Sequence, residues 1–96
     1  MYSDTPTETL DVTGESCPIP VVKTKQAVDD LARGALLEVH ATDVGSVSDI
    51  DGWAGGTPGV ELVDQSEHTY NNETVYVHRV RVEWKSVHPY RGESNV

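Results

Sequence analysis

A corner at residues 14–20, with the sequence Gly-Glu-Ser-Cys-Pro-Ile-Pro, constrains the fold of this chain more than any other segment. Proline lacks a backbone N–H, and the first turn of a helix has no intrahelical acceptor for that group, so the two prolines favour a helix opening. The preceding residues 9–13 alternate apolar and polar side chains, as a short half-buried strand does. The sequence therefore predicts a strand-to-helix corner, broken at Gly14, with Cys17 at or just before the first helical position.

Hydrophobic periodicity predicts the elements that follow this corner. The expected elements are a helix over 21–32, a strand over 35–42, a short helix opening at Ser46 or Ser48, and strands over 60–69 and 73–85. Asn71-Asn72 suits the turn between the last two strands, because asparagine tolerates positive φ. The order β-α-β-α-β-β predicts an α+β fold. Its architecture is a two-layer α/β sandwich, with two helices packed on one face of a four-stranded mixed sheet.

The length of 96 residues allows one small domain with a single core. We expect residues 9–85 to form that domain, residues 1–8 to form a flexible tail and residues 86–96 to form a polar C-terminal tail. No apolar run reaches the roughly 18 residues of a membrane span, and the N-terminus lacks a signal-peptide pattern. We therefore expect a cytoplasmic protein without membrane contact, acting as a monomer.

The charge balance is strongly acidic, with 16 Asp and Glu residues against 7 Lys and Arg residues and a formal net charge of -9. A surface of this sign repels phosphate backbones, which argues against direct nucleic-acid binding. The acids are scattered along the chain, which favours a surface adapted to high salt (a halophilic-type surface). An acidic partner-binding face is the alternative.

The single cysteine, Cys17, excludes an internal disulfide and a Cys-x-x-Cys redox pair. A helix N-terminus favours an anion, and such positions lower thiol pKa values from about 8.5 to roughly 3.5–7.5. The corner therefore predicts a thiolate at Cys17. A small, inert, buried cysteine is the alternative.

The four histidines, His40, His68, His78 and His88, lack the spacing of a metal site, so we expect surface residues and neither a metal nor a cofactor. None is expected near the corner, where a cysteine protease would need a base. A thiol activated by its electrostatic surroundings alone suits a carrier that holds a group as a thioester or persulfide.

The motif Asp11-x-x-Gly14-x-x-Cys17-Pro18-x-Pro20 resembles the signature of the TusA-like sulfur-carrier proteins, a superfamily that includes SirA-, YedF- and YeeD-like members. The resemblance covers roughly residues 10–85. It also includes these positions farther along the chain: Gly34, Thr42-Asp43 and Ser48-Asp49-Ile50. Known members of this family have the β-α-β-α-β-β sandwich.

The resemblance implies a sulfurtransferase function in which Cys17 carries sulfane sulfur as a persulfide. Gly14, Pro18 and Pro20 match residues that shape its loop, and Asp11 matches a motif position. The implied donor is a cysteine desulfurase or a rhodanese-like protein, and the implied acceptor acts in tRNA thiolation, molybdenum-cofactor synthesis or related sulfur trafficking. A noncatalytic interaction or regulatory module with the same fold, and a redox-sensing thiol, are the alternatives.

Overall fold

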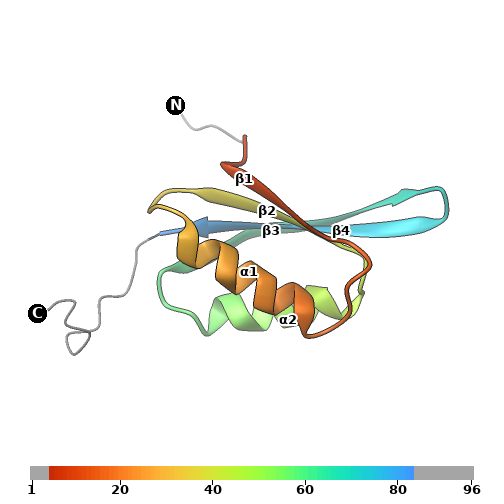
Figure 1. The fold of residues 1–96 in the computed structure, drawn as a ribbon, viewed down its shortest axis with the longest axis horizontal. Coiled ribbons are helices and arrows are strands. Elements are labelled where there is room, and N and C mark those ends of the chain that lie inside the picture. Colours follow the sequence, from red (N-terminus) through yellow and green to blue (C-terminus); the bar gives the residue numbers. More distant parts are fainter. Residues whose placement is uncertain (1–4, 84–96) are drawn as a thin grey trace, which may run out of the picture.

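The computed structural model describes residues 5–83 and has the predicted order of elements. The elements are β1 (Glu8–Val12), α1 (Ile19–Asp30), β2 (Leu36–Ala41), α2 (Gly45–Gly55), β3 (Val60–Tyr70) and β4 (Glu73–Val82). Figure 1 shows one sheet with both helices lying against the same face. The predicted α+β sandwich with a four-stranded mixed sheet is confirmed.

The strand order β1-β2-β4-β3 brings the candidate site together. β1 pairs with β2 in parallel, and β4 pairs with both β2 and β3 in antiparallel fashion. Parallel neighbours end at the same edge of a sheet, so the loops that follow β1 and β2 are adjacent. The first of these loops contains Cys17 and leads into α1, whereas the second leads into α2.

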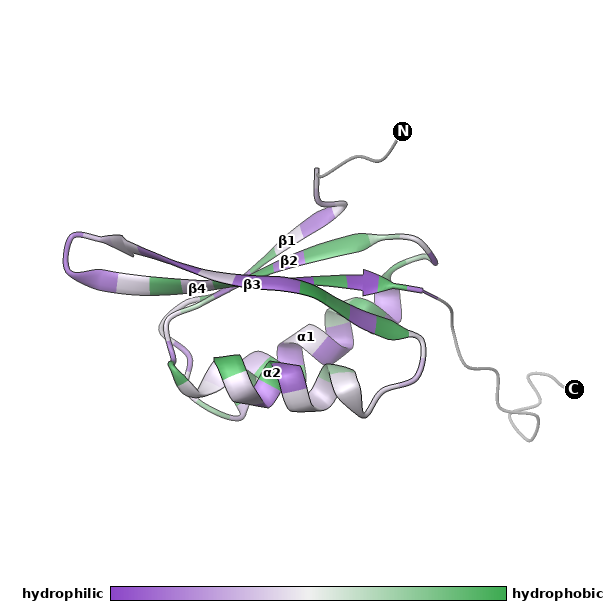
Figure 2. Cartoon of the chain, turned by 180° about the vertical axis from the view of Figure 1, so that it is seen from behind, coloured by the Kyte–Doolittle hydropathy of each residue, from purple (hydrophilic) through white to green (hydrophobic). Residues whose placement is uncertain are grey.

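The core lies between the helices and one face of the sheet. Its fully or almost fully buried side chains are Val12, Val28, Leu37, Val39, Ala41, Ile50, Val80 and Val82. On β2 the core-facing residues alternate, as the period of two in a strand requires. Figure 2 shows the resulting hydrophobic (green) segments on the strands and helices that enclose this layer. The core fixes both helices, and therefore the two loops before them.

The β3–β4 hairpin extends beyond the rest of the sheet (Figure 1). β2 pairs with β4 only as far as Tyr76, whereas β3 continues to pair with β4 up to Glu73. Asn71 and Asn72 close the hairpin with φ values of 50° and 68°, which confirms the predicted turn chemistry. A two-stranded arm therefore projects from the molecule.

Several boundaries differ from the sequence prediction. β1 begins at Glu8, and Thr7 N–H already donates to the carbonyl oxygen of Leu36 at 2.7 Å, so pairing starts before residue 9. α1 begins at Ile19, two residues before the expected start, because the Pro-x-Pro segment is itself the first turn. The proposed tails fall largely outside the described residues, as do positions 84 and 85 of the expected last strand. No helix within residues 5–83 is long and apolar enough to cross a membrane.

Candidate functional site

The loop between β1 and α1 depends on Gly14. Its φ of +83° lies in the left-handed region, which favours glycine, and its N–H donates to Thr42 Oγ1 at 2.8 Å. A Cβ built at this position would meet no atom within 4 Å, so the requirement for glycine is conformational and not one of space. The Gly14–Thr42 contact ties the Cys17 loop to the loop that follows β2.

Asp11 has a local structural role in the same loop. Its Oδ1 accepts hydrogen bonds from Thr13 N–H at 2.9 Å and from Thr13 Oγ1 at 2.6 Å. Both bonds favour the charged carboxylate, and the hydroxyl bond makes the larger contribution to lowering the pKa of Asp11. The structure thus gives Asp11 a turn contact instead of a contact with the thiol.

The backbone at Cys17 is held by Asp43, which lies 26 positions away in the sequence. Cys17 N–H donates to Asp43 Oδ2 at 2.8 Å, and Asp43 Oδ1 accepts from Gly45 N–H at 3.1 Å. One carboxylate therefore bridges the Cys17 loop and the start of α2. Pro18 is the N-cap of α1 and follows a cis Cys17–Pro18 peptide bond, while Pro20 is buried in the first turn.

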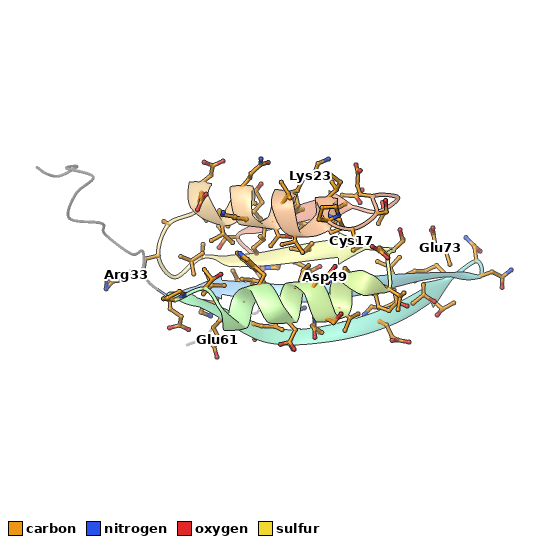
Figure 3. All side chains as sticks on the ribbon, turned by 90° about the horizontal axis from the view of Figure 1, so that it is seen from below. Cys17, Lys23, Arg33, Asp49, Glu61 and Glu73 are labelled. Carbon is orange, nitrogen blue, oxygen red and sulfur yellow. The ribbon has the colours of Figure 1, made fainter. Side chains whose placement is uncertain are left out.

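The Cys17 thiol is exposed and donates to Asp49 Oδ2, with 2.7 Å between sulfur and oxygen. Figure 3 shows Cys17 and Asp49 between the two helices, Asp49 projecting from α2. The hydrogen bond to Asp49 raises the pKa of the thiol above its usual value, and desolvation and the negative charges of Asp49 and Asp43 add to this. The predicted low-pKa thiolate is therefore wrong. A carboxylate in direct contact outweighs the partial charge of the α1 N-terminus.

Exposed apolar side chains occur on the segments that form this site. Ile19 and Val22 lie on the first turns of α1, and Val44, which is 68% exposed, immediately follows Asp43. Lys23 Nζ forms an ion pair with Glu15 Oε2 at 3.2 Å, so this lysine of α1 is directed to a carboxylate. The surface around Cys17 is thus apolar and acidic.

The three histidines within residues 5–83 do not contact Cys17. His40 lies opposite Asp11 in the β1–β2 register, and its Nε2 is 2.6 Å from Glu38 Oε2. His78 is fully buried beneath α2, so the prediction that it is a surface residue is wrong. It faces the core because it shares the even-numbered, core-facing side of β4 with Val80 and Val82. His88 lies outside the described residues.

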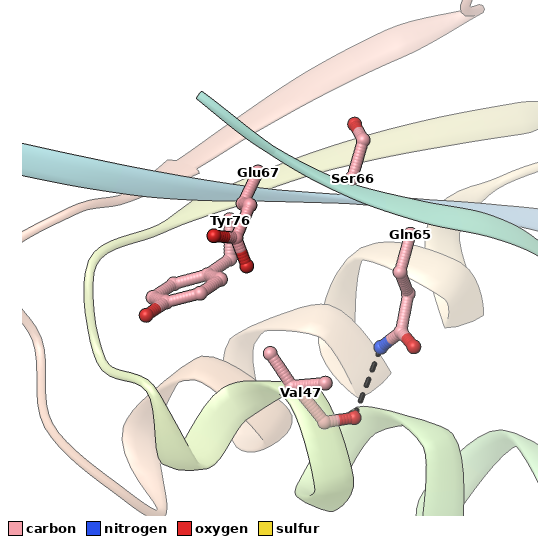
Figure 4. A pocket seen from close by; sticks show the side chains of 5 residues that line it. All are labelled: Val47, Gln65, Ser66, Glu67 and Tyr76. Carbon is pink, nitrogen blue, oxygen red and sulfur yellow. Dashed lines mark hydrogen bonds between the residues drawn. The ribbon is translucent and has the colours of Figure 1, made fainter. Parts of the chain in front are cut away.

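A pocket in the described part of the chain is separate from the thiol. A pocket of about 310 Å³ lies between α2 and the β3–β4 strands, lined by Val47, Gln65, Ser66, Glu67 and Tyr76. Gln65 Nε2 crosses from β3 to donate to the carbonyl oxygen of Val47 at 2.9 Å (Figure 4). Residues 5–83 contain no group of three His, Cys, Asp or Glu side chains placed to hold a metal ion.

The sequence prediction missed the roles of the two carboxylates that hold Cys17. Asp43 and Asp49 belong to the segments Thr42-Asp43 and Ser48-Asp49-Ile50 that carry the family resemblance, so the available signal was an acid in the loop after β2 and a second acid on α2. Asp43 and Asp49 lie 26 and 32 positions after Cys17, and local sequence patterns do not reveal contacts over such separations. These contacts arise from the parallel pairing of β1 and β2.

The chain is similar to known sulfur carriers. The family model described as "Sulfurtransferase TusA" matches residues 8–82. A Halobacterium salinarum protein named as a candidate sulfur carrier is 69% identical over 75 residues, which cover 78% of this chain and 88% of the relative. The sulfur carrier protein TusA of Allochromatium vinosum is 41% identical over 58 residues, covering 60% of this chain and 75% of that protein.

The fold comparison agrees with the family match. The crystal structure of a SirA-like protein from Desulfitobacterium hafniense superposes with a TM-score of 0.59 at 27% sequence identity. The match covers 76% of this chain and 95% of that structure. The chain therefore belongs to the TusA-like family of sulfur carrier proteins.

Proposed function

We propose that this protein accepts sulfane sulfur on Cys17, holds it as a persulfide and relays it to an acceptor protein. The observation that carries the proposal is an exposed thiol, the only cysteine of the chain, at the opening of α1 in a member of a sulfur-carrier family. Gly14, Pro18 and Pro20 support the thiol by shaping the loop, and Asp11 supports the turn.

The sulfur transfer requires no redox cofactor. The sulfur of Cys17 forms a new S–S bond to the terminal sulfur of a donor persulfide, and the S–S bond within the donor breaks. The donor leaves as a thiolate and takes up the proton that Cys17 released, so a thiol and a persulfide give a persulfide and a thiol. Release to an acceptor nucleophile repeats this exchange with the carrier as the donor.

The surface chemistry favours transfer between proteins. With a net charge of -9 the carrier repels nucleic acid, so in tRNA thiolation it would deliver sulfur to an enzyme and not to the RNA. A cysteine desulfurase or a rhodanese-like protein is the proposed donor. The acceptor is a protein of tRNA thiolation, molybdenum-cofactor synthesis or related sulfur trafficking, and the proposed location is the cytoplasm.

Intact-mass spectrometry tests the proposal. Incubation with a cysteine desulfurase and cysteine, or with a rhodanese and thiosulfate, is expected to add the mass of one sulfur atom. Cys17→Ser is expected to abolish the adduct completely, whereas Ser16→Ala, a change of similar size at the neighbouring exposed position, should leave it intact. Wild-type protein that gains no sulfur from any of these donors would contradict the proposal.

The raised pKa of the Cys17 thiol favours one alternative, a noncatalytic interaction module that retains the fold. This alternative predicts that Cys17→Ala leaves partner binding unchanged and that the wild-type protein never carries sulfur. A redox-sensing thiol instead predicts an intermolecular disulfide after peroxide treatment, visible on non-reducing gels.

A further inference from the structure

We propose that Asp49 holds the thiol proton of Cys17 and thereby makes the empty carrier selective for sulfur donors that present a positive charge. This inference rests on the proposed function and adds a positioning residue and a partner chemistry to it. The geometry that carries it is the 2.7 Å contact between Cys17 Sγ and Asp49 Oδ2.

The position of Asp49 is fixed by the core. Asp49 precedes Ile50, which is fully buried, and it follows Ser46, whose hydroxyl contacts the buried His78 at 3.0 Å. These anchors on both sides of Asp49 set the rotation of α2 about its axis. The carboxylate is therefore presented to the thiol by a packed helix and not by a mobile loop.

The charged groups around the thiol are three carboxylates and one lysine. Asp49 approaches from α2 and Asp43 from the preceding loop, while on the α1 side Glu15 is paired with Lys23 at 3.2 Å. Two carboxylates thus oppose a thiolate on Cys17, and the lysine charge is partly neutralised by Glu15. An incoming cation would offset the carboxylates and favour release of the thiol proton, whereas an incoming anion would be repelled.

The sulfur-transfer step follows from this arrangement. When a donor persulfide with an adjacent Lys or Arg side chain docks, the cation pairs with Asp49, and the Cys17 proton passes to solvent, from which the donor thiolate takes up a proton once it has left. The Cys17 sulfur then forms the S–S bond to the terminal sulfur as the donor S–S bond breaks. Away from such a donor the thiol stays protonated, and protonated thiols react slowly with adventitious oxidants and electrophiles.

A pair of small thiol reagents tests the charge selectivity without any sulfur donor. The trimethylammonioethyl and sulfonatoethyl methanethiosulfonates share a reacting group and differ in the sign of their charge. At a separation of about 6 Å in water, one carboxylate changes the ratio of the two rates by roughly tenfold. We expect the wild-type protein to prefer the cationic reagent and Asp49→Asn to lose about that factor of preference at low salt.

The pH dependence of alkylation by neutral iodoacetamide gives a second readout. Asp49→Asn is expected to lower the apparent pKa of Cys17. Each unit of decrease gives about ten times more thiolate at neutral pH, which the lower nucleophilicity reduces to a gain of roughly three- to fourfold in rate. Asp49→Glu, which keeps the carboxylate, should retain a preference for the cationic reagent.

Asp51→Asn is the matched control, because it removes the same charge from an exposed position two residues farther along α2. Circular dichroism spectra that match the wild type establish that the variants are folded. Equal reagent selectivity in Asp49→Asn and Asp51→Asn would overturn the role of Asp49, even if the wild type loads sulfur normally. Failure of the wild type to load sulfur would instead overturn the proposed function and leave the reagent result standing.

Discussion

Helix α2 carries two polar contacts of opposite character. On one side Asp49 accepts a hydrogen bond from the exposed Cys17 thiol, and on the other Ser46 contacts the fully buried His78. The pKa of the thiol is raised by a neighbouring carboxylate, whereas burial lowers the pKa of His78 to about 4. The exposed contact retains a charge and a reactive atom, whereas the buried contact is neutral at physiological pH.

The hydrogen bonds of His78 define its protonation. Gln65 Nε2 lies 3.0 Å from His78 Nδ1, and an amide nitrogen can only donate, so Nδ1 accepts. His78 Nε2 then carries the proton and donates to Ser46 Oγ at 3.0 Å. The same Gln65 amide also donates to the carbonyl oxygen of Val47. Nε2 of the ring thus fastens α2 to the sheet directly, and Nδ1 holds Gln65, whose amide also reaches α2, whereas Cys17 is left accessible for chemistry.

The contrast between the two contacts of α2 predicts that the largest loss of stability follows from removing the buried His78 side chain. His78→Ala leaves a cavity and two unpaired polar groups, and we expect it to lower the free energy of unfolding by about 3–4 kcal/mol in urea denaturation. His68→Ala, at an exposed position on β3, is the matched control and should change the free energy by less than about 0.5 kcal/mol. A His78→Ala variant as stable as the control would mean that the buried contact is not structural.

Acid should weaken the buried contact of His78. Below the unfolded-state pKa of 6.5 the unfolded chain binds a proton at His78 that the folded chain refuses until about pH 4, so stability falls as pH falls through this window. The loss from this group approaches about 3 kcal/mol at pH 4, and it shrinks to less than about 0.1 kcal/mol one unit above the unfolded-state pKa of 6.5.

Denaturant titrations at pH 7, 5.5 and 4.5 measure this loss. A His78→Gln variant keeps hydrogen-bonding groups without a titrating ring, and it should show a smaller loss than the wild type over the same range. Identical pH profiles for the two proteins would assign the acid sensitivity to carboxylates instead.

The smallest predicted effect is on the rate at which a donor protein loads sulfur onto Cys17, through the exposed Val44 side chain beside Asp43. Val44→Ser is expected to slow sulfur loading from a protein donor by roughly two- to fivefold, since most interface side chains contribute less than about 1 kcal/mol. Loading from a small persulfide, such as glutathione persulfide, should be unchanged because no docking surface is involved. Val63→Ser is the control, because Val63 is also an exposed valine but lies on β3. Equal loading by the two variants would argue against docking next to Asp43.

Much of the fold could be predicted from local patterns. The alternation on β2 and β4 identifies two strands and their buried faces, whereas the Pro-x-Pro segment locates the start of α1 and Asn71-Asn72 locates the hairpin turn. Cys17 was also identifiable, because its position before the helix depends only on adjacent residues. The pKa of its thiol was predicted wrongly because it depends on the contact with Asp49, which lies 32 positions away in the sequence.

The sequence by itself determined the order of the elements, the corner that presents Cys17 and the family motif, since these depend on residues close together in the chain. The tertiary structure decided the chemical state of the two titratable groups. The pKa of the Cys17 thiol is raised because parallel pairing of β1 and β2 brings Asp43 and Asp49 to it. His78 is neutral because the packing of α2 on the sheet removes it from water. In both cases the pKa depends on neighbours that only the folded chain brings together.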